Sequence, residues 1–357
     1  MNKQVQPTPR AGDSAGLISV IIPSFNSART IERCILGVLA TQERQLEIIV
    51  IDDASTDQSP QLVAALAAAH PMVIKLQRQA VNGGPARARN AGAAVAGGRY
   101  LFFLDSDTEM LPEALANFRC RISEADAVVG IYDARPLNIG WVPLYKALLN
   151  NYFFSRKGVI AYEVFDSSRA GIRAEIFRSV GGFNENLGWG MDYENEELGY
   201  RLCKSFKLIL DPAIVVRHNF PGFGELTRTY FQRVALWMEI LLVRRKFESG
   251  GVTSADTGLA SASLLGAILL VPLTLLPLPD GAAPVAGLLS VGLFLIYLYG
   301  YFGLFAFVFR RAPWFIIPAV ILNIYFTTVI ALGACLGILR TMAGKSEVRS
   351  LRRSDVG

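Results

Sequence analysis

The chain has 357 residues, of which 52% are hydrophobic and 18% charged, and its mean hydropathy is +0.35. This composition is too apolar for a purely soluble or disordered protein, and the length allows one large domain and a further module. The net charge of +5 comes without a basic stripe interleaved with aromatic residues, so we expect no nucleic-acid partner.

The amino-terminal segment 1–16 is polar, contains Pro and Gly, and lacks the apolar core of a signal peptide. We therefore expect a disordered lead. The four cysteines show neither metal-ligand nor disulfide spacing, and we expect them to be reduced and mostly buried, as in the cytosol: Cys34, Cys120, Cys203 and Cys335.

Short β-branched runs alternate with amphipathic helical patterns over the first 131 residues. The predicted strands are 17–22, 46–51, 73–76, 100–104 and 127–131, and the predicted helices are 30–40, 61–69, 85–96 and 112–120. This alternation predicts an α/β fold with a doubly wound, mostly parallel sheet. Ligands bind at the carboxyl ends of the strands in such sheets. Polar motifs follow three of these ends, at Pro23–Asn26, Asp52–Asp53 and Asp105–Asp107.

The carboxyl-terminal third is predicted to meet a membrane. Residues 226–250 begin with an apolar set that Glu239 interrupts and Arg244-Arg245-Lys246 close, which favours an interfacial amphipathic helix; the alternative is a core helix of the soluble domain. Region 258–340 contains three apolar segments, each long enough for a crossing of roughly 20 residues. They are 259–279, 285–309 and 314–339, and a basic tail follows at 341–357.

The charges beside these segments predict an orientation but leave a conflict. Arg310-Arg311 marks a cytoplasmic loop, which predicts a multi-pass protein of the cell inner membrane with a cytoplasmic catalytic domain. Three crossings would then place the basic tail outside, against the positive-inside rule. Either one segment is re-entrant, the first being broken by Pro272 and Pro277, or the rule fails here.

Asp105-Ser106-Asp107 directly follows the predicted strand 100–104. Two carboxylates at this spacing offer hard oxygen ligands for Mg²⁺ or Mn²⁺, and the ion would also bind substrate phosphates. Such an ion neutralises charge that develops on a departing diphosphate. The alternative for an isolated triplet of this kind is helix capping.

Further motifs accompany this triplet in a fixed order. They are Ser19–Asn26, Val50–Asp57, Asn82–Gly92, Asp105–Asp107, Gly181–Glu185 and Glu194–Leu202. Together they closely resemble the family 2 glycosyltransferases, which have the GT-A fold, over about residues 17–220. The resemblance implies a GT-A domain at 17–225 that transfers a sugar, with inversion, from a nucleotide-diphosphate sugar. UDP is the commonest nucleotide at such a site.

By that resemblance the nucleotide-sugar site contains Pro23, Phe25, Asn26, Asp52, Asp53, Gly84, Arg89, Asn90 and Asp105. The metal ligands would be Asp105, Asp107 and His218. Purely structural roles are the alternative for several of these residues: turn formation for Asp52, the start of a helix after a loop for 82–92, and a structural role for His218. For Asp57 we favour turn formation and helix capping over a role in binding.

The sequence departs from the family pattern at Asn195. Family members usually carry Glu-Asp at the positions of Glu194 and Asn195, and the Asp is the usual general base. Because Asn cannot accept a proton at neutral pH, either Glu194 or Asp192 replaces it or no strong base is needed. A phosphate monoester is already anionic at pH 7, so a polyprenyl-phosphate acceptor would tolerate the loss. The alternative is a hydroxyl acceptor in cell-surface polysaccharide or glycolipid synthesis.

Transfer of a single sugar to a lipid or membrane-proximal acceptor is expected, because Gln232–Trp237 does not match the Gln-x-x-Arg-Trp motif of related polymer synthases. A nucleotidyltransferase would need a glycine-rich, basic loop after the first strand, which Pro23–Asn26 does not supply. A non-catalytic membrane scaffold with a decayed transferase domain is the remaining class. Asn195 suggests it, and the intact Asp105-Ser106-Asp107 argues against it.

Overall fold

The computed structural model describes residues 16–187, 193–244, 255–276 and 281–345. The chain divides into two compact units, the first made of Met1–Asn138 with Phe154–Asn219 and the second of Ile139–Phe153 with Phe220–Gly357. The domain limits drawn from the sequence stay predictions. Almost all of the expected lead 1–16, most of the expected tail 341–357, and Asp192 lie outside the described residues.

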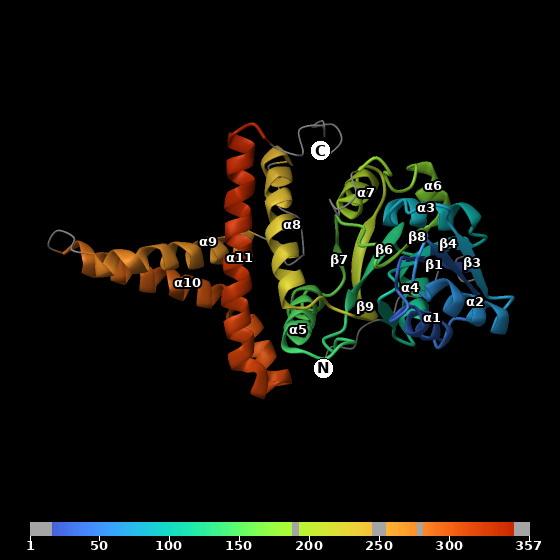
Figure 1. Cartoon of the computed structure of the whole chain (residues 1–357), viewed down its shortest axis with the longest axis horizontal. Helices are drawn as coiled ribbons and strands as arrows, with labels where there is room; N and C mark the ends of the chain where they lie inside the picture. Colours follow the sequence, from blue (N-terminus) through green and yellow to red (C-terminus); the bar gives the residue numbers. More distant parts are fainter. Residues whose placement is uncertain (1–15, 188–192, 245–254, 277–280, 346–357) are drawn as a thin grey trace. The chain divides into compact units, whose positions relative to one another are not determined.

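The first unit is built on one mixed sheet of nine described strands (Figure 1). Its order is β3-β2-β1-β4-β8-β6-β9-β5, with β7 paired to β9. The strands are β1 Ile18–Ser24, β2 Leu46–Asp52, β3 Ile74–Arg78, β4 Tyr100–Leu104, β5 Thr108–Met110, β6 Ala127–Tyr132, β7 Ile160–Ala161, β8 Arg169–Arg173 and β9 Leu208–His218.

Strands β1 to β4 are parallel, as the alternating pattern predicts, and β6 runs parallel to β9. Strand β8 lies antiparallel between β4 and β6, and β5 is antiparallel to β9. The predicted α/β, mostly parallel sheet is therefore confirmed. Strands β1 and β4 are buried along nearly their whole length, because helices cover both faces of the sheet.

Six of the described helices belong wholly to this unit: α1 Ile31–Leu39, α2 Ser59–Ala69, α3 Pro85–Val95, α4 Ala114–Arg121, α6 Ala174–Ser179 and α7 Glu194–Leu202. Helix α3 starts at Gly84, whose φ of 86° favours glycine, followed by Pro85 in the first turn. Helix α1 buries Cys34 in the core. The expectation of mostly buried cysteines is wrong, since the other three are exposed.

The second unit is helical. It contains most of α5 (Trp141–Ser155), α8 (Phe223–Arg244), α9 (Ala255–Leu270) with a 3₁₀ extension, α10 (Ala282–Arg311), a 3₁₀ turn at Pro313–Phe315, and α11 (Ile316–Met342). Three helical stretches are long and apolar enough to cross a membrane, with mean hydropathies of 2.0, 2.0 and 2.2: Ala255–Leu275, Ala282–Arg311 and Pro313–Met342. The three long apolar helices are thus confirmed, while the interfacial role of 226–250 stays a prediction.

Helix α7 packs closely on the segment 163–165 through Gly199. A Cβ at this position would overlap the carbonyl oxygen of Glu163 and lie 2.7 Å from the backbone nitrogen of Phe165. Since these are backbone atoms, they cannot rotate away. Gly199→Ala is expected to lower the free energy of unfolding by about 2 kcal/mol, measured by thermal or denaturant melts of the protein in detergent.

Gly224→Ala is the matched control, because a Cβ there would meet nothing within 4 Å and the residue lies in α8. We expect this variant to be neutral or slightly more stable. Equal melting curves for the two variants would show that α7 does not approach residues 163–165 as closely as described.

Candidate active site

The loops that follow β1 and β2 are held together at one edge of the sheet. Ser24 and Asp52, the last residues of the two strands, are register partners, and the Asp53 amide donates to the Ser24 carbonyl at 2.8 Å. The Asn26 side-chain oxygen accepts from the backbone amides of Thr56 at 2.9 Å and Asp57 at 3.3 Å. Asn26 therefore braces the two loops in this structure.

Asp57 accepts hydrogen bonds from the backbone amides of Ala28 at 3.0 Å and Ser59 at 2.9 Å, the latter in the first turn of α2. These bonds are what the turn-forming interpretation of Asp57 requires. Beside this brace Pro23 is half-buried and Phe25 is 45% exposed. An aromatic ring that exposed at the end of a central strand is open to a ligand.

The two acids that end β2 have different partners. Asp53 is buried and accepts from the backbone amides of Gly83, at 3.0 Å, and Gly84, at 2.8 Å, so it holds the loop before α3. Asp52 is buried too, and its Oδ2 accepts from Arg78 Nε at 3.2 Å. Its Oδ1 has no hydrogen-bond partner among the described residues. That oxygen is therefore the acceptor in this pair of acids that the described residues leave unused.

Arg89 joins three elements through a buried ion bridge. Its Nη2 donates to Asp105 Oδ1 at 2.8 Å and its Nη1 to Glu194 Oε1 at 3.2 Å, while its guanidinium lies 5.6 Å from the Phe183 ring. The side chain is 4% exposed. Burial alone would lower the pKa of Arg89, but the charges of Asp105 and Glu194 outweigh it and raise that pKa. Arg89 therefore stays cationic and holds both acids at the sheet edge.

Asp107, directly before β5, meets His218, the last residue of the antiparallel strand β9. The Thr108–His218 register pair joins β5 to β9 and brings His218 Nε2 to 3.4 Å from Asp107 Oδ2. The carbonyl of Asp107 accepts from the Asn219 amide at 2.9 Å, and the His218 ring lies 4.8 Å from the Tyr132 ring. The predicted metal residues thus fall into two sets, with Asp105 engaged by Arg89 and Asp107 beside His218.

The donor set of Asp107 and His218 fits a divalent ion that the substrate completes. No three His, Cys, Asp or Glu side chains in the described part of the chain come close enough to hold a metal by themselves. A metal at a phosphate site needs only one or two protein carboxylates, because phosphate oxygens and water complete the shell. The Asp107 carboxylate meets that requirement for Mg²⁺ or Mn²⁺, and His218 adds an imidazole beside it.

Two of the three residues predicted for catalysis, Glu194 and Asn195, lie at the start of α7, and Asp192 is outside the described residues. Glu194 is in the Arg89 bridge, whereas the Asn195 side-chain oxygen accepts from the Ser167 amide at 3.2 Å. The Asn195 carbonyl accepts from the Phe165 amide at 3.0 Å. Asn195 consequently docks α7 on the segment before β8.

A buried polar network beside the site was not foreseen from the sequence. Arg169, 1% exposed, pairs with Asp166 at 2.6 Å and lies 3.9 Å from the Tyr132 ring, and Ser168 links Asp166 to the Tyr132 hydroxyl. Burial alone would raise the pKa of the Asp166 carboxyl, but Arg169 outweighs it and holds that pKa below its usual value. Nothing in the local pattern of Arg169–Arg173 marks it as a buried strand.

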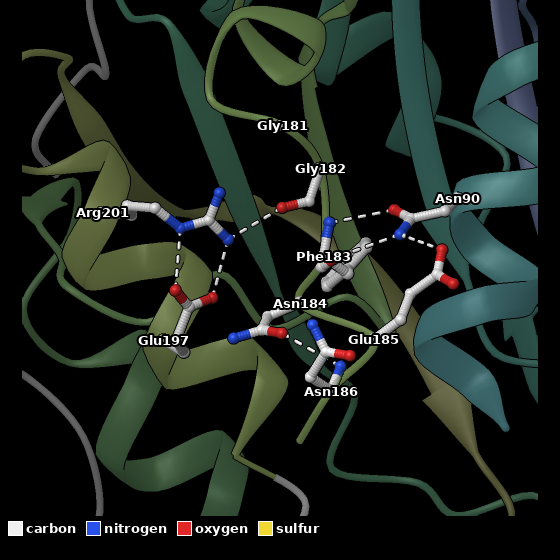
Figure 2. A pocket seen from close by; sticks show the side chains of 9 residues that line it. All are labelled: Asn90, Gly181, Gly182, Phe183, Asn184, Glu185, Asn186, Glu197 and Arg201. Carbon is white, nitrogen blue, oxygen red and sulfur yellow. Dashed lines mark hydrogen bonds and ion pairs between the residues drawn. The ribbon is translucent and has the colours of Figure 1, made fainter. Parts of the chain in front are cut away.

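An open hollow of about 480 Å³ is lined by Asn90 of α3, by residues 181–186, and by Glu197 and Arg201 of α7 (Figure 2). Figure 2 shows Asn90 pointing at the Phe183 backbone, with which its amide exchanges hydrogen bonds of 2.8 and 2.9 Å, and at Glu185. Across the hollow Arg201 pairs with Glu197. Arg89 and Asn90 are neighbours in the chain, but Arg89 belongs to the ion bridge and Asn90 lines this hollow.

Comparison with known sequences finds a family match in the amino-terminal half of the chain. The family described as "Glycosyl transferase family 2" matches residues 19–181. The succinoglycan biosynthesis protein ExoO of Rhizobium meliloti is 37% identical over 34% of this chain and 34% of its own length. The glycosyltransferase GlyG of Streptococcus pneumoniae is 33% identical over 32% of this chain and 39% of its own. The chain therefore spans little more than a third of the length of these curated relatives.

A solved structure extends the likeness of fold. The mannosyltransferase PcManGT from Pyrobaculum calidifontis, in complex with GDP-Man and Mn²⁺, has a TM-score of 0.55 to this chain and 17% sequence identity. The likeness covers 96% of this chain and 91% of that one. Residues 19–181 therefore match glycosyltransferase family 2 in sequence, and the fold is GT-A-like, followed by three long apolar helices.

Proposed function

We propose that the chain transfers one sugar from a nucleotide-diphosphate sugar to a lipid acceptor at the membrane. The observation that carries the proposal is the Arg89 bridge, which holds Asp105 and Glu194 together at the carboxyl end of the parallel strands. An α/β sheet binds ligands at this edge. The mannosyltransferase of similar fold was solved with a nucleotide-diphosphate sugar and Mn²⁺, which supports this donor class.

The nucleoside would bind between the loops after β1 and β2. The exposed Phe25 ring offers a face for a base, and Asp52 Oδ1 offers an acceptor for an N–H or a ribose hydroxyl. Asp53 would act indirectly, because both of its oxygens hold the Gly83–Gly84 loop. A uracil N–H suits a carboxylate acceptor, so UDP-sugars are the first donors to test.

Asp107 and His218 would hold Mg²⁺ or Mn²⁺, which neutralises the charge on the departing diphosphate when bound. Asp105 faces the same strand end but is turned to Arg89, so it would set the charge balance of the site and orient the donor. His218 would bind the ion through Nε2, the nitrogen that faces Asp107.

The side chains at the start of α7 favour a phosphate acceptor. Glu194 would have to break its pair with Arg89 to take a proton, and Asn195 cannot take one. A polyprenyl phosphate needs no proton removed at neutral pH, whereas a sugar hydroxyl does. The three long apolar helices support a membrane location for such an acceptor. We place the catalytic domain on the cytoplasmic side of the inner membrane, because nucleotide sugars are made in the cytoplasm.

Asp107→Asn tests the metal site. The variant keeps the size of the side chain but loses the anionic ligand, so we expect Mn²⁺-dependent release of nucleoside diphosphate to fall at least about 100-fold. The assay compares a panel of nucleotide sugars with and without a chelator, and release of pyrophosphate from a triphosphate would instead indicate a nucleotidyltransferase.

Asp256→Asn serves as the control for this substitution, because Asp256 is an exposed acid in the first turn of α9. Its rate should equal that of the unmodified protein. Metal-dependent release that survives in Asp107→Asn would remove Asp107 from the site, and no release by the unmodified protein with any donor would favour a scaffold.

Asn195→Asp tests the class of acceptor. An Asp oxygen can still accept from the Ser167 amide, so the fold should persist while a base is gained. With a polyprenyl-phosphate acceptor we expect a rate within about twofold of the unmodified protein, measured as radiolabel entering the lipid extract. A large gain in rate would mean that the natural acceptor is a hydroxyl.

A further inference from the structure

Helices α8 and α11 of the second unit pack side by side, in constant register, along most of the length of α8. Gly333 faces the Phe231 carbonyl, where a Cβ would come to 2.6 Å, and Gly337 faces the Ala235 carbonyl one turn later. The ring of Tyr325 lies 4.8 Å from that of Phe223. In each of these three contacts the residue of α11 comes 102 positions after its partner in α8. The two helices therefore run parallel and keep the same register along this contact.

Helix α8 carries charges at places where a membrane-spanning helix would meet hydrocarbon. Arg233 is exposed at its middle, beside the exposed Gln232, and Arg228 is exposed five residues earlier. Glu239 is fully buried and lies 3.9 Å from Arg340 of α11. Exposed cations in the middle of a helix are costly inside a bilayer, but they are favourable at its headgroups. Helix α8 is therefore suited to the membrane surface.

Because α11 stays beside α8 from Phe223 to Glu239, it must share the orientation of α8. Its hydropathy of 2.2 would by itself indicate a crossing. Its exposed apolar side chains, however, form one stripe at helical spacing, including Ile317, Ile321, Tyr325, Leu332, Leu339 and Met342. A single apolar stripe with a buried opposite face is typical of a helix that dips into the interface.

Helices α9 and α10 have the opposite character. They form an antiparallel hairpin, in which Ser290 Oγ donates to the Ala267 carbonyl at 2.9 Å, and only 28% and 22% of their most apolar windows are buried. In Ala282–Arg311 the first charged residue is Arg310. Figure 1 shows the hairpin extending away from the α8–α11 pair, and a hydrogen bond of 2.5 Å from Tyr297 to Asn323 joins α10 to α11.

From these contacts we infer that only the α9–α10 hairpin crosses the bilayer, and that α8 and α11 lie together along one membrane surface. The partner of the α11 stripe is the acyl boundary of the lipid. Two crossings return the chain to the side from which it entered. Arg310, Arg311 and Arg340 then share one side, as the positive-inside rule requires, and the conflict that three crossings create disappears.

Sidedness is tested with cysteine variants of the full chain in which the exposed Cys120, Cys203 and Cys335 are replaced by Ser. Asp256→Cys, Ala282→Cys and Lys345→Cys are labelled with a membrane-impermeant maleimide in sealed and lysed vesicles. We expect residues 256 and 345 to be labelled from one side and residue 282 from the other. Labelling of 345 from the same side as 282 would mean that α11 crosses, and labelling of all three from one side would mean that the hairpin does not.

Depth is tested with nitroxide labels at Ile317→Cys, Ile321→Cys, Leu332→Cys and Leu339→Cys on α11. A helix in the interface should give nearly one depth at all four sites, within about 5 Å. Labels at Val285→Cys, Leu288→Cys and Leu295→Cys on α10, all before the contact of Tyr297 with α11, serve as the crossing control and should pass through the bilayer centre. If the labels on α11 also passed through the bilayer centre, the inference would be overturned. Neither measurement requires turnover, so both are independent of the proposed activity.

Discussion

A single buried cation holds the polar edge of the first unit together. Arg89 reaches from α3 to Asp105 after β4 and to Glu194 at the start of α7, elements far apart in the chain. Removing a charge of this kind would leave two carboxylates near one another without compensation, which costs several kcal/mol. The planar guanidinium can donate to two acids at once, and a lysine cannot do so with the same geometry. The bridge therefore determines where both acids lie when a donor arrives.

The two units meet different physical demands. In the first unit, loops are held by hydrogen bonds to buried acids, as where Asp53 holds Gly83 and Gly84, so polar groups can gather at one edge without disturbing the core. In the second unit, polar groups inside apolar helices are paired, as in the hydrogen bonds that Tyr297 and Tyr145 make with Asn323. Such pairing is required wherever helices meet lipid, because hydrocarbon supplies no partner.

The sequence was sufficient for the parallel half of the sheet and for the apolar helices, because buried strands and membrane-length helices leave continuous apolar runs. It was insufficient for β8, whose Arg169 and Arg173 hide a buried strand, and for α5, whose first thirteen residues pack with the helices of the second unit. By resemblance the sequence also placed Arg89 in the nucleotide-sugar site, but it did not indicate the ion bridge. The ion-pair partners of Arg89 come from long-range folding, which local patterns do not contain.

The most direct test of the Arg89 bridge is a double-mutant cycle between Arg89→Ala and Glu194→Gln. The free energy of unfolding is measured for the four proteins in detergent. If the bridge exists, Arg89→Ala costs about 3 kcal/mol alone and at least about 1 kcal/mol less in the Glu194→Gln background, where one uncompensated charge is already gone. Equal costs in the two backgrounds would mean that Arg89 and Glu194 do not interact, and the account of this site would fail.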